Sequence, residues 1–135
     1  IQMERSLIFI KPDGVERGLA GEILSRFEKR QIKINRLELR QPTESLVETH
    51  YQEHIDKPFF PRLKEYILSG PIIVIVLEAE NVVKIVRDMV GSTNPADAAP
   101  GTIRADYGLT TAFNLIHASD SPESAEREIK LFFGS

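Results

Sequence analysis

The chain has 135 residues, of which 41% are hydrophobic and 27% charged, the mixture of an ordinary globular domain. That length predicts a single domain over residues 1–135. The net charge of −3 argues against strong binding to a nucleic-acid backbone, and the lack of cysteine excludes disulfides and thiol catalysis. We expect a cytoplasmic protein, because the longest apolar run (72–77) is too short to cross a membrane and residues 1–6 lack a signal-peptide core.

The first third of the chain predicts two strands around a helix. The apolar run 7–10 is typical of a strand buried on both faces, and it stops at a turn-rich tetrapeptide, 11–14. Apolar residues then recur at helical spacing and predict an amphipathic helix over 19–31. Residues 32–39 alternate in polarity, with a break at Asn35-Arg36, and predict a second strand with a more solvated face.

The middle of the chain predicts three helices and a further strand. Thr43 can cap the first helix, and residues 59–68 predict the second. Residues 72–77 are rich in β-branched side chains and are the clearest strand signal in the sequence. Residues 80–89 follow as a helix that Gly91 can end.

The last part of the chain begins with a stretch that lacks periodicity. Residues 92–112 predict a long loop, and residues 113–117 a last short strand. Ser121-Pro122 marks a helix start, with the serine as the cap and the proline at the first helical position. The order of elements predicts an α+β protein: a ferredoxin-like sandwich with a four-stranded antiparallel sheet covered by helices.

Two of the histidines lie four residues apart in a segment predicted to be helical. The spacing of His50 and His54 is compatible with a metal site on one helix face. However, the segment is polar and offers only Glu53 and Asp56 as further ligands. Surface or ligand-facing histidines are therefore the better interpretation.

The third histidine lies at the end of the last predicted strand. His117 leads into a helix N-terminus, where negative charge is favoured, although a simple polar residue at a strand exit fits equally well. Glu128 falls at the edge of the apolar stripe of the following helix, so its carboxylate can turn back toward His117. A carboxylate that binds one ring nitrogen leaves the other nucleophilic, whereas the alternative is a solvated charge.

The sequence contains neither a P-loop nor a Rossmann fingerprint, so phosphate binding would need scattered cations. Lys11 is rigidly placed after a buried strand, and Arg104 stands alone inside the long predicted loop. Arg87, judged by itself, is a solvated helix residue. Phe59 is either a core residue or a surface on which a base can stack.

The segment Asn114-Leu115-Ile116-His117-Ala118-Ser119-Asp120-Ser121 resembles the signature of the nucleoside diphosphate kinase family, in its short, bacterial-type members. Matching segments occur in order along almost the whole chain: 4–15, 17–23, 50–51, 57–60, 69–71, 91–95 and 100–104. The resemblance implies a reversible ping-pong transfer of the γ-phosphate from a nucleoside triphosphate to a nucleoside diphosphate, through a phosphohistidine on His117.

The resemblance also implies roles for individual residues. Glu128 would orient the nucleophile, with Ser119 as a candidate second contact. The residues implied in catalysis are His117, Lys11, Tyr51, Asn114 and Glu128. The residues implied in nucleotide binding are Lys11, His50, Phe59, Leu63, Arg87, Thr93, Arg104 and Asn114. Of these, the two arginines and Thr93 would hold phosphates, Lys11 and Asn114 the sugar hydroxyls, and Phe59 and Leu63 the base.

The cofactor and partners implied by the resemblance are Mg²⁺, nucleoside di- and triphosphates and further copies of the chain. Mg²⁺ would ride on the phosphates without direct protein ligands, with Glu53 and Asp120 as candidates for water-bridged contact. The copies would form a hexamer or a tetramer built from dimers. Neither a membrane nor, as main partner, a nucleic acid is expected.

Two other classes of function remain open on sequence alone. One is a nucleotide-binding module without turnover, and the other a nucleic-acid-binding protein on the same fold. A degenerate binder is expected to lose at least one of His117, Lys11, Arg104 and Glu128, and all four are present. The nucleic-acid alternative lacks the aromatic RNP pattern and has the wrong net charge.

Overall fold

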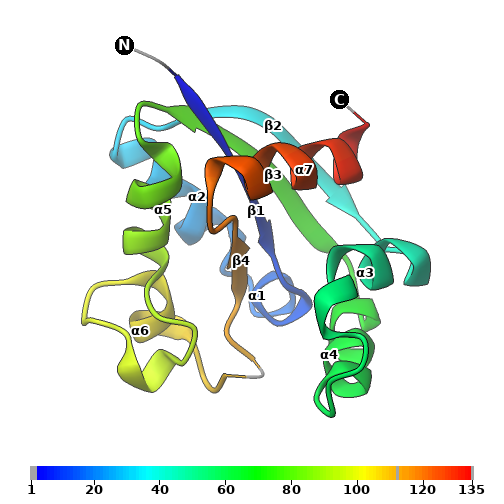
Figure 1. The fold of residues 1–135 in the computed structure, drawn as a ribbon. Coiled ribbons are helices and arrows are strands. Elements are labelled where there is room, and N and C mark those ends of the chain that lie inside the picture. The colour runs from blue at the N-terminus through cyan, green and yellow to red at the C-terminus, as the bar shows by residue number, and fades with distance from the viewer. Residues whose placement is uncertain (1–2, 112, 135) are drawn as a thin grey trace.

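The computed structural model describes residues 3–111 and 113–134. Within them, a four-stranded antiparallel sheet has the strand order β2-β3-β1-β4 (Figure 1). The strands are β1 (Glu4–Ile10), β2 (Lys33–Arg40), β3 (Ile72–Ala79) and β4 (Ile116–Ala118). The α+β class and the ferredoxin-like antiparallel sheet are therefore as the sequence predicts.

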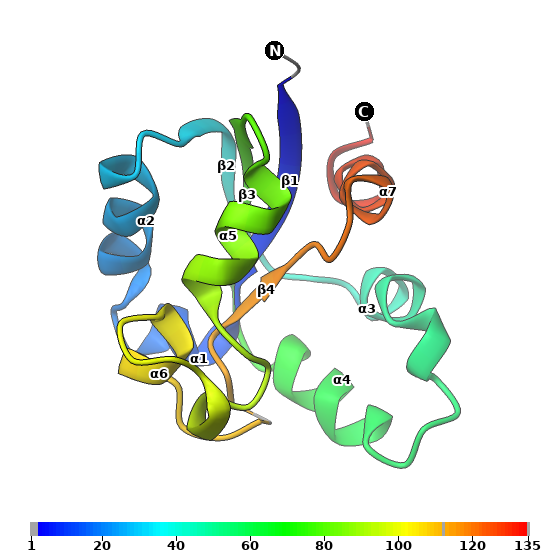
Figure 2. The ribbon, with the colours of Figure 1, turned by 60° about the vertical axis from the view of Figure 1, so that its left-hand side comes forward.

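Helices cover both faces of this sheet. They are α1 (Pro12–Glu16), α2 (Ala20–Lys29), α3 (Glu44–His50), α4 (Phe60–Leu68), α5 (Val82–Val90), α6 (Ile103–Tyr107) and α7 (Pro122–Phe133), with the 3₁₀ turns η1 (Gln52–His54) and η2 (Pro95–Asp97). Figure 2 shows α2 and α5 on one side of the sheet and α7, with α3 and α4, on the other. No helix in the described part of the chain is long and apolar enough to cross a membrane.

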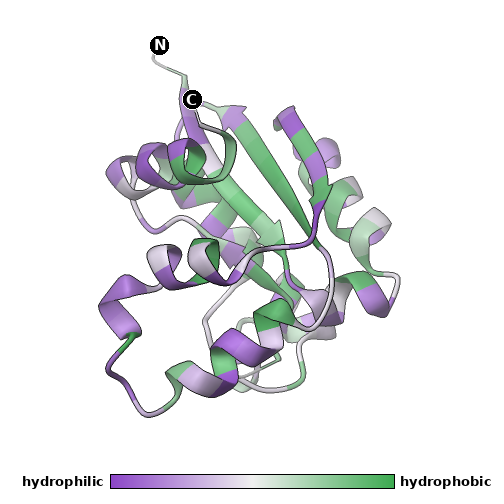
Figure 3. Ribbon diagram, turned by 90° about the vertical axis from the view of Figure 1, so that its right-hand side faces the viewer, coloured by the Kyte–Doolittle hydropathy of each residue, from purple (hydrophilic) through white to green (hydrophobic). Residues whose placement is uncertain are grey.

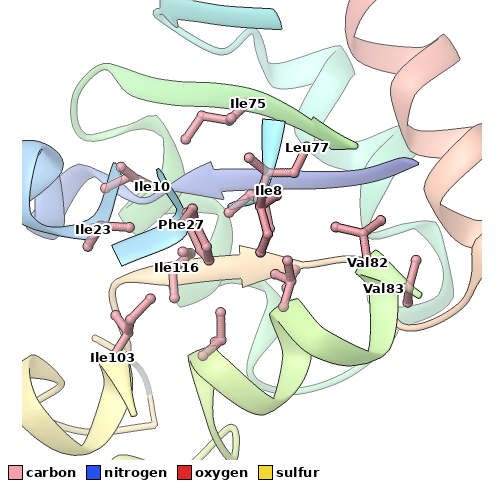
Figure 4. Packing of buried hydrophobic residues seen from close by; sticks show 14 of the residues in the cluster. Ile8, Ile10, Ile23, Phe27, Ile75, Leu77, Val82, Val83, Ile103 and Ile116 are labelled. Carbon is pink, nitrogen blue, oxygen red and sulfur yellow. The ribbon is translucent and has the colours of Figure 1, made fainter. Parts of the chain in front are cut away.

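Strand β1 lies at the centre of the core because its side chains alternate between two apolar layers. Ile8 and Ile10 pack with Phe27 of α2 and the valines of α5, as Figure 4 shows for the first layer. Leu7 and Phe9 point to the other face, toward α3, α4 and α7. Accordingly, the central strands are largely apolar in Figure 3, whereas the helices carry hydrophilic bands. The predicted burial of both faces is confirmed.

Strand β2 is the exposed edge of the sheet. Its ladder with β3 has an irregularity between Ile34 and Arg36, at the point where the sequence loses its alternation. Leu37 and Leu39 on this strand are 50% and 61% exposed. The predicted solvated face is confirmed, and it includes apolar side chains.

The helix caps follow the sequence closely. The hydroxyls of Thr43 and Ser121 accept hydrogen bonds from the third residue of α3 and α7, respectively. Gly91 ends α5 with a φ of 93°, a conformation that glycine adopts without strain.

Two predictions for the loops are wrong. Residues 11–14 do not form a simple turn: Pro12 opens α1, because its fixed φ suits the first helical position. Residues 92–112 contain η2 and α6, and each is too short to show helical periodicity. Thr102 caps α6 through its hydroxyl. Ala112, the last residue of that predicted loop, lies outside the described residues.

The predicted strand 113–117 is also placed wrongly, because β4 begins only at Ile116. Leu115 has a φ of 74°, in the left-handed region, which interrupts extended structure. The buried Leu115 side chain and the hydrogen bond from Lys11 N to Leu115 O (2.7 Å) hold this conformation. A non-glycine residue at positive φ is uncommon and often occurs beside a functional site.

Candidate active site

A pocket of about 740 Å³ is lined by β4, by loops around α5 and α6, and by the α3–α4 segment. Figure 2 shows these segments arranged around the lower half of the molecule. The pocket brings together the residues to which the sequence analysis assigned a role, except Ser119, which is fully buried behind it. They are Lys11, His50, Tyr51, Glu53, Phe59, Leu63, Arg87, Thr93, Arg104, Asn114, His117, Asp120 and Glu128. They come from almost the whole length of the chain.

At the base of the pocket, Glu128 binds the ring of His117. Oε1 of Glu128 lies 2.9 Å from Nε2 of His117 and 2.7 Å from the hydroxyl of Ser119, which donates to it. The carboxyl is buried, which disfavours its charge, but the hydrogen bonds from His117 and Ser119 outweigh burial and lower the pKa of Glu128. An ionised Glu128 places the ring proton on Nε2 and leaves the lone pair of Nδ1 free.

Ser119 is fully buried and ties this arrangement to the sheet. Its hydroxyl accepts a hydrogen bond from the backbone N–H of Leu7 in β1 at 3.1 Å while it donates to Glu128. The ring of His117 in turn stacks on Phe9 at 4.8 Å between centroids. Both contacts come from β1, so the central strand fixes the imidazole and its carboxylate partner.

Lys11 is a buried amine on the pocket wall. Its Nζ donates to Oδ1 of Asn114 at 2.7 Å. Burial, and then the nearby charge of Arg104, lower the pKa of Lys11 to about 7. A phosphate placed here would favour the charged amine.

Arg104 is held by three backbone carbonyls. Its guanidinium donates to the oxygens of Gly91 at 3.0 Å, Asn114 at 3.3 Å and Ile116 at 2.6 Å. Burial, and then the charge of Arg87, lower the pKa of Arg104 to about 10, so it stays charged at neutral pH. The backbone thus orients Arg104 without neutralising it.

Arg87 is exposed along α5, as its sequence position suggests, but its guanidinium reaches the pocket and donates to Ala118 O at 3.3 Å. Nearby, Asn114 donates to Thr93 O at 3.0 Å and so anchors the loop that follows α5. Within residues 3–111 and 113–134, Lys11, Arg87 and Arg104 form no ion pair, whereas Arg127, at the edge of the pocket, lies 3.9 Å from Glu128. Cations without a carboxylate partner make the pocket suitable for an anion.

Aromatic side chains form the outer part of the pocket. Phe59, which precedes α4, is 50% exposed and lies beside His54 at 5.5 Å between ring centroids. Leu63 and Phe113 also line this part, and Phe113 packs edge-on against Tyr66. Phe59 is therefore an exposed ring at a pocket rather than a core residue.

The two histidines spaced four residues apart do not share a helix face. Helix α3 ends at His50, and His54 lies in the separate turn η1. His50 instead contacts the ring of His117 edge-on at 4.7 Å and the ring of Tyr51 at 4.5 Å. Both histidines line the pocket, which agrees with their interpretation as surface or ligand-facing residues.

Buried environments keep two of these groups uncharged. Burial is the main reason that the pKa of His50 falls to about 3, with the charge of His117 as the next cause. Burial, followed by the charge of Glu128, raises the pKa of Tyr51. His50 and Tyr51, which lie beside His117, are therefore both neutral at physiological pH.

Sequence reasoning missed the supports of this pocket. The hydroxyl of Tyr66 on α4 donates to Asp13 of α1 and so connects two walls. Arg26 of α2 binds Asp106 of α6 at 2.6 Å and Gly101 O at 2.9 Å, and it braces the segment that carries Arg104. These pairs are far apart in sequence, so no local pattern reveals them.

The geometry supports one kind of chemistry. An imidazole with a free ring nitrogen can act as a nucleophile, and its carboxylate partner stabilises the ring when charge develops. The unpaired cations beside it stabilise negative charge, as transfer of a phosphoryl group requires. An exposed ring at the mouth offers a stacking surface for a base.

Comparison with known proteins agrees with this description. The family model for nucleoside diphosphate kinase matches residues 4–135. The nucleoside diphosphate kinase of Archaeoglobus fulgidus is 53% identical over 97% of this chain and 87% of its own, and that of Methanocorpusculum labreanum is 57% identical over 97% and 88%. Two solved nucleoside diphosphate kinases superpose with a TM-score of 0.96. One, from Encephalitozoon cuniculi, is 41% identical over 98% of this chain and 90% of its own. The other, from Halobacterium salinarum in complex with CDP, is 45% identical over 99% and 90%. The chain belongs to the nucleoside diphosphate kinase family, a family of phosphotransferases.

Proposed function

We propose that this protein transfers the γ-phosphate of a nucleoside triphosphate to a nucleoside diphosphate through a phosphohistidine on His117. The observation that carries the proposal is the hydrogen bond between Nε2 of His117 and Glu128, which leaves Nδ1 free in a pocket that also contains Lys11, Arg87 and Arg104. Family membership supports the overall reaction. The covalent step rests on the geometry of the pocket.

In the first half-reaction, the lone pair of Nδ1 attacks the γ-phosphorus in line with the bridging oxygen. The N–P bond forms as the bond from phosphorus to that oxygen breaks, and the nucleoside diphosphate leaves with the electron pair. Glu128 stabilises the positive charge that develops on the ring. In the second half-reaction, a terminal oxygen of another diphosphate attacks phosphorus, the N–P bond breaks and neutral His117 is restored.

The cations of the pocket act on the transferred group. Arg87 and Arg104 offset charge on the phosphates, and Lys11 gains a proton when an anion approaches. Because Arg104 is already held by backbone carbonyls, little reorganisation accompanies the reaction. Tyr51 and His50, both neutral, line the space beside the nucleophile and the inner phosphates.

The nucleotide enters with its base toward the mouth of the pocket. Phe59 stacks on the base and Leu63 packs beside it, while Lys11 and Asn114 bind the sugar hydroxyls and Thr93 a phosphate. Stacking depends weakly on base identity, so purines and pyrimidines are both substrates. The complex of a Halobacterium salinarum relative with CDP supports a pyrimidine nucleotide as ligand.

Mg²⁺ fits this pocket as a companion of the nucleotide. The carboxylates of Glu53 and Asp120 line it, and Mg²⁺ in proteins is commonly held by substrate phosphates, waters and one or two carboxylates. When bound, it neutralises part of the phosphate charge. Glu53 and Asp120 would contact it through water.

We also propose that the chain assembles into a hexamer, or alternatively a tetramer, built from dimers. Strand β2 lies at an edge of the sheet, where one side of its backbone has no partner strand, and it exposes the apolar side chains of Leu37 and Leu39. A second copy that pairs with β2 would cover both the backbone edge and these side chains. Light scattering measures the mass of the particle and distinguishes the two assemblies.

The test of the function is isotope exchange. Incubation with ATP and radiolabelled ADP should produce radiolabelled ATP, because ADP is itself a nucleoside diphosphate that accepts the phosphoryl group. His117→Ala should abolish the exchange while nucleotide binding persists. Binding without exchange in the unaltered protein would instead identify a nucleotide-binding module.

A further inference from the structure

Three potential metal ligands converge at the base of the pocket. His50 ends α3, His117 lies in β4 and Glu128 lies in α7, and one ligand atom from each lies within 4.8 Å of the others. Oε1 of Glu128 and Nε2 of His117 are already only 2.9 Å apart. The pair His50 and His54, which the sequence singled out, therefore contributes one histidine to a cluster whose other members lie far along the chain.

We propose that a divalent transition-metal ion of the zinc class binds His50, His117 and Glu128 and switches off the nucleophile. Two imidazoles and one carboxylate form a ligand set that is typical of zinc sites with an open fourth position. Mg²⁺ prefers oxygen ligands and retains its waters, so it is not expected to compete here. The regulatory part of this inference rests on the proposed function, whereas the metal site itself does not.

The site is close to being preformed. Bonds of about 2.0–2.1 Å to a tetrahedral ion require ligand atoms about 3.4 Å apart. The 4.8 Å limit on the cluster means that side-chain shifts of about 1 Å bring the ligands together. His50 already contacts the ring of His117 edge-on, at 4.7 Å between ring centroids. Glu128 is ionised and held by Ser119.

The surroundings provide access to the ion. A second cavity of about 100 Å³ is lined by His50, Glu128 and Glu53, so the cluster borders space on two sides. Glu53 adds negative charge there, which offsets the positive charge of Arg127 on the same cavity.

Binding of a metal stops phosphorylation whichever ring nitrogen of His117 is used. If the ion binds Nδ1, it occupies the lone pair that attacks phosphorus. If it binds Nε2, it displaces the ring proton to Nδ1, and protonated Nδ1 has no lone pair to donate. In both cases, Glu128 exchanges its role as hydrogen-bond partner for that of a metal ligand. The metal and the phosphoryl group are therefore mutually exclusive.

The first experiment measures metal binding without any reference to activity. Co²⁺, whose visible absorption reports tetrahedral nitrogen and oxygen ligands, is titrated into the nucleotide-free protein, and Zn²⁺ is then added as a competitor. We expect one equivalent to bind, to be displaced by Zn²⁺ and to resist millimolar Mg²⁺. His50→Asn and Glu128→Gln should each weaken binding by at least about tenfold. His54→Asn is the matched control, because His54 is outside the cluster, and it should leave Co²⁺ affinity unchanged.

The outcomes separate this inference from the proposed function. Equal Co²⁺ affinity in His50→Asn and the unaltered protein, or an equal loss in His54→Asn, would overturn the metal site. If ATP–ADP exchange fails but the Co²⁺ spectrum and its dependence on His50 persist, the proposed function fails and the metal site stands. If exchange occurs, Zn²⁺ should inhibit it. The Zn²⁺ inhibition constant should be at least tenfold higher in His50→Asn than in the unaltered protein, with the activity of each protein expressed relative to its own rate without Zn²⁺. Exchange unaffected by saturating Zn²⁺ would overturn the regulatory part. Thermal unfolding of each variant verifies that it is folded.

Discussion

Replacing Glu128 by glutamine tests the link between the carboxylate and the nucleophile. The substitution keeps the shape of the side chain but removes the charge that accepts hydrogen bonds from His117 Nε2 at 2.9 Å and from Ser119 at 2.7 Å. A hydrogen bond to a charged group is worth about 1.5–3 kcal/mol, and a neutral one about 1 kcal/mol. The stabilisation of the developing imidazolium should fall by about 1–2 kcal/mol. The rate of phosphorylation should therefore fall about 5- to 30-fold.

The assay is single-turnover labelling with radioactive ATP under rapid quench, with nucleotide affinity measured separately by calorimetry. We expect the labelling rate to fall while the ADP dissociation constant changes less than twofold, because Glu128 lies behind the ring rather than on the nucleotide. Glu123→Gln is the matched control, since Glu123 is exposed in the first turn of the same helix. A Glu128→Gln rate within twofold of the original, or a parallel loss of ADP affinity, would refute the reasoning.

Three further perturbations test other parts of the account. Nucleotide binding at pH 8 should take up a proton at Lys11, because its pKa of about 7 in the empty pocket rises beside a phosphate, and nucleotide affinity should therefore weaken as pH rises above 7. Calorimetry in buffers with different ionisation enthalpies should give different heats of binding, and equal heats would contradict this assignment. Gly91→Ala should destabilise the protein by about 2–4 kcal/mol in urea unfolding, since φ is 93° and a Cβ would lie 2.6 Å from Thr102 Oγ1. Gly101→Ala is the control: its φ is 94° but a Cβ there would meet open space, so it should cost only about 1–2 kcal/mol. Equal losses of stability in the two variants would exclude the steric contact at Gly91. Phe59→Ala should weaken ADP and CDP binding alike by about 1–3 kcal/mol, and a loss confined to one base would argue against simple stacking.

The sequence was informative where local chemistry determines the structure. Buried strand β1, the caps at Thr43 and Ser121, and the irregularity near Asn35 all follow from patterns within a few residues. Helical periodicity places Glu128 at the edge of an apolar stripe, from which it can turn toward His117 or remain a solvated charge, and the structure shows the contact with His117.

The remaining features depend on contacts between distant parts of the chain. Helix α6 was missed because it is short and its stability comes from the Thr102 cap and from Arg26 on α2. The late start of β4 follows from the positive φ of Leu115, which no residue preference predicts. His50 meets His117 only because α3 and β4 are brought together by the sheet, and the sequence showed instead its spacing to His54.

The central claim is that His117 carries the phosphoryl group between two nucleotides. The most direct measurement is to locate the phosphate on the protein after incubation with ATP in the absence of acceptor. The labelled protein is digested, and its peptides are analysed by mass spectrometry under alkaline conditions. The account predicts one alkali-stable, acid-labile phosphate on the peptide that contains His117, removed by added ADP and absent in His117→Ala. A phosphate on another residue, or turnover that persists in His117→Ala, would contradict it.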